Sequence, residues 1–402
     1  MRVKSKIKYK KNTQYLLLLL LVSALILLKT WRGLLFQTEQ EGGVWNVIQV
    51  FLVGTGVICL LSKSKPFLSF PFIKVYIAFF LYIWFFSAIW YFSDYSSINR
   101  LFRFLVVPYG LMSLLTFFTV GLKGNIRQYV WVLLATYLIL FYIMFTKWSS
   151  YNLSIIDSKG AVADVYYLIG LLPIVLLYIP QKYKIIPFLL AFIVAVMSSK
   201  RGALIATIVM LIVYYLIGTG KSGEKRNIIL RVFAVAAALV VAYIVVMYFV
   251  ERYNLSIFDR IEKLEDDGGS GRSDRWALII HDYTSNTNIL NLLFGNGTGS
   301  VIDLTGGHAH NDFLEFLYEY GIVAFILYIL FDLLLIKETI RMYRKRYIYA
   351  KEFACSVSVA ICMSLFSFYA VDCTHITSSS ICQGLILADW YKFKKGIQIL
   401  KQ

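Results

Sequence analysis

The sequence contains little cysteine and little histidine. Only five cysteines and four histidines occur among 402 residues, and no two cysteines form a Cys-x-x-Cys pair. All five cysteines lie in or beside apolar runs, so we interpret them as small residues of membrane helices, with a disulfide or a metal site as the alternative. The chain also lacks an internal repeat and any low-complexity tract beyond the apolar runs.

Hydrophobic residues, by contrast, make up 59% of the chain, and the mean hydropathy is +0.68. Apolar runs of about 20 residues recur from end to end, and each can cross about 30 Å of hydrocarbon as a helix. The runs are continuous rather than alternating, which favours helices over a closed barrel. The composition therefore predicts an all-α polytopic integral membrane protein that forms a single membrane domain over residues 1–402.

We expect twelve transmembrane spans. The net charge of +17 does not indicate a nucleic-acid partner, because the basic residues cluster in short loops between apolar runs and at the two ends. Their asymmetry places both termini in the cytoplasm, and no small-x-small cleavage site follows the first run, so an uncleaved first span is expected. The predicted spans are 15–36, 44–61, 72–92, 101–120, 128–146, 161–179, 185–199, 202–218, 228–250, 311–336, 353–371 and 376–391.

One segment, residues 251–310, contains no spanning run, and the predicted topology places it outside as an extracytoplasmic loop. Within it, 256–265 is typical of a short amphipathic helix, and 272–282 of a second helix. Residues 295–299, Gly-Asn-Gly-Thr-Gly, form a glycine-rich turn cluster. A structured outer loop of this length usually carries function.

Two basic segments are candidate anion sites. Lys200 and Arg201 separate two short apolar runs with almost no loop between them, and a guanidinium beside a helix start suits phosphate oxygens. Arg272 and Arg275 offer a second phosphate clamp on the outer loop. The alternatives are a plain outer turn for the first pair and a solvated helix face, paired with Asp274, for the second.

Segment 306–321 places titratable residues at the start of a membrane helix. His310 can accept a proton from a hydroxyl near neutral pH, and a helix start presents free N–H groups to an anion or a developing alkoxide. For His310 the alternative to a catalytic role is helix capping. For His308 a structural role is favoured over a catalytic one. At helical spacing, Gly321 shares a face with His310 and could let another helix or a lipid tail approach closely.

Further polar residues of this segment are expected to support the site. Asp312, Glu315 and Glu319 share a stripe that must face protein or water, and Asn311 directly follows His310. His308, His310 and Asp312 raise the alternative of zinc, but no fourth ligand has suitable spacing, so we expect no metal and no cofactor. His281 and His375 are interpreted as incidental.

Three motifs in this order resemble the O-antigen ligase and polymerase superfamily of bacterial envelope glycan enzymes. They are Ser-Ser-Lys-Arg-Gly-Ala at 198–203, Arg-x-x-x-Trp at 272–276 with Leu-Phe-Gly-Asn-Gly at 293–297, and Ala-His-Asn at 309–311 with Gly321. Two departures occur: Ala324 stands where many members have glycine, and Ile205 stands where ligase-type members often have leucine.

The resemblance implies a metal-independent glycosyltransferase, similar in fold to type-C glycosyltransferases, in the cytoplasmic membrane of a bacterium. Its donor would be an undecaprenyl-diphosphate-linked glycan, and a glycan hydroxyl would be the acceptor. Arg201 and Arg272 would hold the diphosphate, and His310 would activate the hydroxyl on the outer face. Membrane lipids, chain-length regulators and flippases are the other implied partners, and nucleic acid is not.

Three functions remain open from the sequence. A polymerase would join lipid-linked repeat units into O-antigen, capsular polysaccharide or exopolysaccharide. A ligase would transfer finished glycan to a lipid A-core or another acceptor. A lipid-linked glycan flippase or permease, from a different class, would not need His310.

Overall fold

The structure is a computed structural model of the chain. It describes residues 13–36, 42–93, 98–124, 126–150, 164–198, 200–217, 268–367, 369–370 and 373–396, together with five residue pairs between 236 and 252. The predicted helix 256–265 and most of the predicted span 228–250 lie outside these residues. Throughout the described ranges the regular secondary structure is helical and no strand occurs.

Helices occupy the other eleven predicted spans, and the four helices α1, α3, α5 and α14 are each long and apolar enough to cross a membrane. The part of the chain that the structure describes is therefore all-helical and consistent with a membrane protein, as the apolar runs indicated, and the count of twelve spans stays a prediction. The helices are α1 (Thr13–Phe36), α2 (Gly42–Phe67), α3 (Pro71–Ser93), α4 (Ile98–Lys123), α5 (Ile126–Ser150), α6 (Val165–Val175), η3 (Gln181–Tyr183), α7 (Ile185–Met197), α8 (Arg201–Leu216), α11 (Gly268–Ser285), α12 (Ile289–Phe294), α13 (Ser300–Thr305), α14 (Asp312–Arg344), α15 (Ala350–Phe366) and α16 (Cys373–Lys394).

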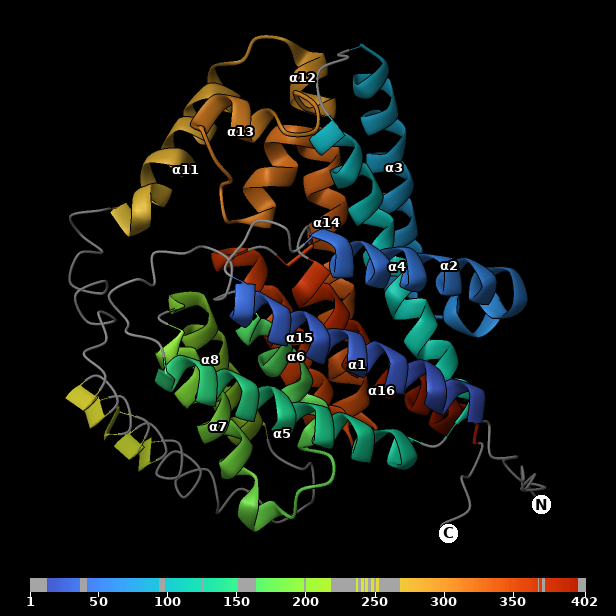
Figure 1. Cartoon of the computed structure of the whole chain (residues 1–402). Helices are drawn as coiled ribbons and strands as arrows, with labels where there is room; N and C mark the ends of the chain where they lie inside the picture. The colour runs from blue at the N-terminus through green and yellow to red at the C-terminus, as the bar shows by residue number, and fades with distance from the viewer. Residues whose placement is uncertain are drawn as a thin grey trace.

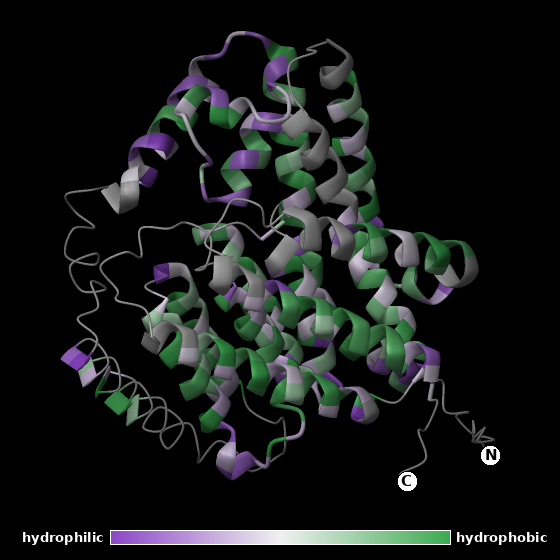
Figure 2. Ribbon diagram, viewed as in Figure 1, coloured by the Kyte–Doolittle hydropathy of each residue, from purple (hydrophilic) through white to green (hydrophobic). Residues whose placement is uncertain are grey.

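The short helices α11, α12 and α13 gather at one end of the molecule, next to the start of α14 and the end of α3 (Figure 1). Hydrophobic residues dominate the long helices, whereas hydrophilic residues are concentrated on this end (Figure 2). Inside the bundle, α16 packs against α4 and α6, and α15 packs against α8. The predicted second outer helix is present as α11, and it begins four residues earlier than expected.

Helix α14 is broken at Gly321, which has φ 75° and ψ −177°. The part before the break folds back along the part after it, because the Tyr328 hydroxyl lies 3.4 Å from Asp312 Oδ2 and the rings of Phe313 and Tyr328 are 5.2 Å apart. The helix over the predicted span 311–336 is therefore interrupted at Gly321. Two helices joined at a glycine occupy this segment, and only the second continues through the bundle.

The glycine-rich loop after α12 fills the break. The amides of Asn296 and Gly297 donate to the carbonyl oxygens of residues 318 and 319, at 3.0 and 2.9 Å, and the Tyr82 hydroxyl donates to that of residue 320 at 2.9 Å. These groups satisfy carbonyls that a broken helix leaves without partners. A Cβ on Gly321 would lie 2.3 Å from the carbonyl oxygen of Leu293 in the last turn of α12, so the close neighbour is a helix, one of the two alternatives expected.

Candidate active site

The three predicted segments converge on His310. Burial lowers the pKa of the His310 imidazole to about 3, and the charges of Arg272, His308, Lys200 and Arg275 lower it further in that order. These groups come from the start of α8, from α11 and from the loop before α14. Because burial and then the neighbouring positive charges disfavour the imidazolium, the neutral form of His310 is favoured near neutral pH, and this form has a ring nitrogen that can accept a proton.

The backbone around His310 is held in an unusual conformation. His310 has φ 54°, in the left-handed region that residues other than glycine rarely adopt. Arg275 Nη1 donates to the carbonyl oxygen of His308 at 3.2 Å, and Trp276 Nε1 donates to that of Ala309 at 2.6 Å. Helix α11 thus supports this conformation from above, as strained sites require.

Glu315 holds the same loop from below. Its Oε1 accepts from the Ala309 amide at 2.9 Å and lies 3.3 Å from His308 Nδ1, and its carboxylate is 2% exposed. The two interactions use the first-turn glutamate of α14 to hold the residues that lead into His310. His308 therefore contacts Glu315. This contact fits the structural role that the sequence favours for His308.

Asn311 and Asp312 connect the start of α14 to the end of α15. Asn311 Oδ1 accepts from the Leu314 amide at 3.2 Å, and its Nδ2 donates to the Leu365 carbonyl oxygen at 3.2 Å. Asp312 Oδ2 accepts from the amides of residues 369 and 370 at 2.9 and 2.8 Å. Asn311 is therefore the N-cap of α14, and Asp312 fixes the turn that precedes α16.

The stripe of Asp312, Glu315 and Glu319 faces protein, as predicted, since the three residues are 0%, 2% and 3% exposed. Glu319 Oε1 accepts from the Gly299 amide at 2.9 Å and so fixes the glycine-rich loop. Among the described residues, no three histidine, cysteine, aspartate or glutamate side chains gather in the way that a metal ion needs. The structure assigns the three acids supporting contacts with the loops around His310.

Arg272 lies where four helices meet. Its Nη1 donates to the Phe366 carbonyl oxygen at 2.8 Å, at the end of α15. Burial lowers the pKa of Arg272, and the nearby charges of Arg201 and Arg275 lower it too. A Cβ on Gly202 of α8 would lie 3.7 Å from the same Phe366 oxygen and 3.1 Å from the Tyr166 hydroxyl of α6.

In the described part of the chain, Lys200, Arg201, Arg272 and Arg275 are the cations that act on His310 or on one another, so positive charge is concentrated around the histidine. Such an arrangement costs free energy in the unliganded protein and gains it when an anion binds between the cations. Planar guanidinium groups are suited to phosphate oxygens, which they can bind through two parallel hydrogen bonds. The geometry suits an anionic group beside a neutral histidine.

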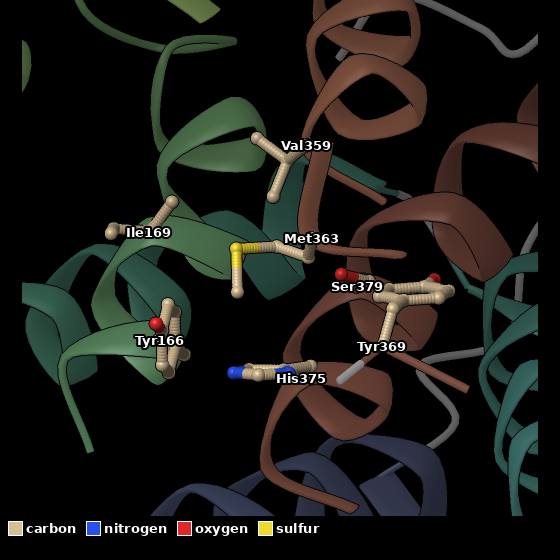
Figure 3. Close-up of a pocket in the computed structure, with 8 residues that line it drawn as sticks. Tyr166, Ile169, Val359, Met363, Tyr369, His375 and Ser379 are labelled. Carbon is tan, nitrogen blue, oxygen red and sulfur yellow. The ribbon is translucent and has the colours of Figure 1, made fainter. Parts of the chain in front are cut away.

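No sequence pattern singles out Tyr166, and His375 is interpreted from the sequence as incidental. In the structure both are buried and line a cavity of about 10 Å³ with Ile169, Gly170, Val359, Met363, Tyr369 and Ser379 (Figure 3). A lone histidine or tyrosine within an apolar run has no local signature, so only the packing of α6 against α16 reveals their proximity.

Residues 186–329 match the protein-family model described as O-antigen ligase. The matched range contains the basic pair before α8, the arginines of α11, the His310 loop and the Gly321 break. The resemblance to the O-antigen ligase and polymerase superfamily is thereby confirmed. No curated protein matches the chain.

Proposed function

We propose that this protein is a glycosyltransferase that polymerises undecaprenyl-diphosphate-linked oligosaccharide repeat units on the outer face of the bacterial cytoplasmic membrane. The observation that carries the proposal is the convergence of Arg272, Lys200 and Arg275 on a neutral His310. The match to the O-antigen ligase family supports this class of chemistry. The twelve-span topology predicted from the sequence, with both termini in the cytoplasm, would put the site on the outer side, where the lipid-linked donor is presented.

In the proposed reaction, Arg201 and Arg272 bind the donor diphosphate, and Lys200 adds charge beside them. The acceptor hydroxyl oxygen forms a bond to the anomeric carbon while the bond from that carbon to the diphosphate oxygen breaks. His310 takes the hydroxyl proton, and the arginines stabilise the negative charge of the departing lipid diphosphate. A single displacement of this kind inverts the anomeric configuration and needs neither a covalent intermediate nor a metal.

The supporting residues have different tasks from those that touch substrate. Arg275 contributes charge, but one of its donors is occupied by the His308 carbonyl, so it positions the His310 loop. Asn311, Asp312 and Glu315 fix the helix start, and Gly321 lets the end of α12 pack against the break in α14. His310 is thus oriented by contacts from α11, α14 and α15.

Transfer by the purified protein in proteoliposomes tests this function, with a lipid-linked repeat unit as donor. We expect His310→Ala to lower the rate by about 100-fold or more, the usual contribution of a general base. His281→Ala is the matched control, because His281 is exposed on α11 of the same outer region. Unchanged transfer by a folded His310→Ala protein would favour a flippase, which has no need of a base.

A ligase is the second candidate within the same chemistry. Deleting the gene separates the two functions, because loss of a polymerase leaves single repeats on the carrier whereas loss of a ligase leaves long polymer on it. We expect single repeats. Stranded long polymer would assign the transfer of finished glycan to a lipid A-core or another acceptor instead.

A further inference from the structure

The hydroxyl of Tyr166 lies at the edge of the cation cluster, which consists of Lys200, Arg201, Arg272 and Arg275. Tyr166 is the second residue of α6 and is 6% exposed, and its hydroxyl oxygen is 3.1 Å from the point where a Cβ on Gly202 would stand. The Phe366 carbonyl oxygen is 3.7 Å from that same point and accepts from Arg272. The phenol, the guanidinium and the first turn of α8 therefore surround one small region.

The first turn of α8 adds hydrogen-bond donors to this region. Helix α8 has 16 residues and begins at Arg201, and the residue before it, Lys200, makes no side-chain capping bond to its amides. Free amides at a helix start attract an anion. Gly202 keeps this end of the helix open, because any larger side chain would contact the Tyr166 hydroxyl.

The Tyr166 ring is held from the opposite side by α16. The ring of His375 meets it at 88° with 4.0 Å between the ring centroids, and Ser378 Oγ donates to the Tyr166 carbonyl oxygen at 3.3 Å. The close-up of the cavity shows the two rings standing against each other beside Met363 (Figure 3). His375 of α16 thus packs edge to face against the Tyr166 ring.

A neutral donor has an advantage at this position. Arg201 and Arg275 already repel the charge of Arg272, so a further cation would increase the repulsion in the unliganded protein. A phenol hydroxyl can donate a hydrogen bond to a phosphate oxygen without adding charge. Hydrogen bonds to charged groups contribute more to affinity than bonds between neutral groups.

We propose that the Tyr166 hydroxyl is a further ligand of the donor diphosphate and that His375 is the positioning residue that fixes the Tyr166 ring. This inference rests on the proposed function, because it assigns a residue to the same diphosphate site. The ring contact matters because a hydroxyl contributes to binding only where its direction is fixed. Without the His375 ring, the Tyr166 ring would lose this edge-to-face contact.

Binding of undecaprenyl diphosphate to the purified full-length protein in detergent micelles tests the first part. We expect Tyr166→Phe to weaken binding roughly tenfold, since a hydrogen bond to a charged group is worth about 1.5 kcal/mol or more. In transfer assays the variant should raise KM for the donor and leave kcat within about twofold, because the same bond is present before and during the reaction.

Two outcomes separate this inference from the proposed function. If the wild-type protein binds the lipid diphosphate and Tyr166→Phe binds it equally well, the assignment of Tyr166 is overturned and the proposed function is untouched. If the wild-type protein does not bind the lipid diphosphate at all, the proposed function fails and this assignment fails with it. Met363→Leu, which alters the cavity wall from α15, is the matched control and should bind as the wild type does.

A double-mutant cycle tests the positioning role of His375. We expect His375→Ala to weaken binding in the Tyr166 background and to have no further effect in the Tyr166→Phe background. His375→Phe should retain most of the affinity, because an aromatic ring at this position can keep the edge-to-face contact. An equal loss from His375→Ala in both backgrounds would overturn the positioning role, since the histidine would then act independently of the hydroxyl.

Discussion

The indole nitrogen of Trp276 lies 2.6 Å from the carbonyl oxygen of Ala309, to which it donates a hydrogen bond. This bond joins an outer-loop helix to the residue directly before His310, 33 positions further along the chain. The bond also gives a reason for the Arg-x-x-x-Trp spacing, because Arg272 and Trp276 lie one turn apart on the same face of α11. Arg272 donates to the Phe366 carbonyl oxygen at the end of α15, and Trp276 donates to the loop that carries His310.

Trp276→Phe should lower the transfer rate by roughly tenfold while the protein remains folded. The substitution keeps most of the apolar ring but removes the donor to a buried carbonyl, a loss of about 1–3 kcal/mol. The measurement is kcat for transfer, together with thermal unfolding in detergent. Tyr283→Phe is the control, because it removes a hydroxyl of the same helix that donates to Leu292 instead of the His310 loop. Equal rates for the two variants would contradict a special role for the indole.

Gly321→Ala should destabilise the protein by about 3 kcal/mol or more, because the backbone there suits only glycine. Its φ is 75°, and a Cβ would lie 2.3 Å from the Leu293 carbonyl oxygen. Thermal unfolding of the purified protein measures the effect. Gly54→Ala is the matched control: a Cβ on Gly54 meets nothing within 4 Å, and alanine within a helix is neutral or slightly stabilising. A Gly321→Ala protein as stable as the control would show that the break is not required.

These two glycines also show what the sequence can and cannot predict. The length of apolar runs predicted the helices, because the hydrocarbon thickness sets the length of a membrane span. Gly54 and Gly170 lie within helices that continue through them, whereas Gly321 ends one helix and starts another. Nothing local distinguishes them. The difference at Gly321 is the loop 293–297, which supplies the missing hydrogen bonds from a separate part of the chain.

In the candidate site, too, some features could be predicted from the sequence and others could not. Residue chemistry and order were enough to select Lys200, Arg201, Arg272 and His310, because cations and titratable groups are costly beside membrane helices and therefore stand out. The contacts that orient them could not be predicted. The amides of residues 369 and 370 bind Asp312 across 57 and 58 positions, and backbone amides are the same in every sequence.

The buried ion pair between Lys29 and Asp164 should be needed as a pair rather than as two separate residues. Lys29 Nζ lies 3.0 Å from Asp164 Oδ1, the side chains are 6% and 3% exposed, and the pair joins α1 to the start of α6. Lys29→Met should destabilise the protein by about 3–5 kcal/mol, because it leaves a carboxylate buried without a partner. The double variant Lys29→Met with Asp164→Asn should recover most of that loss in thermal unfolding.

A second ion pair provides the control for this cycle. Arg341 and Glu338 also lie 3.0 Å apart, but the arginine side chain is 47% exposed, and the buried Glu338 keeps Lys394 and Trp390 as further partners. Arg341→Ala should change stability by less than about 1 kcal/mol, because it removes an exposed charge and leaves the carboxylate paired. If the double variant at 29 and 164 were as unstable as Lys29→Met alone, the unpaired charge would not be the cause of the loss.

The pH dependence of transfer should differ from that of an ordinary histidine base. Burial, with Arg272 and other cations nearby, lowers the pKa of His310 from 6.5 to about 3, so the folded protein binds this proton less tightly than an unfolded chain does. In the free enzyme the imidazole therefore stays neutral as the pH falls from 7 to about 5, and kcat/KM should stay nearly constant over that range. The contribution of neutral His310 to the free energy of unfolding is fully present above pH 6.5, the pKa of an unfolded histidine. It is lost as the pH falls from 6.5 toward 3.

Donor binding should partly reverse this shift, because the diphosphate places negative charge near the imidazole and favours its protonated form. The acid limb of kcat, which reports the donor complex, should therefore lie at higher pH than the acid limb of kcat/KM, which reports the free enzyme. Stopped assays at matched ionic strength between pH 4.5 and 8, a range set about the ordinary histidine pKa, test this: kcat/KM should stay nearly flat across the range, and an acid limb within it should appear in kcat only. An acid limb of kcat/KM near pH 6.5 would contradict the role of the cation cluster, since it would mean that His310 titrates as a solvent-exposed histidine does.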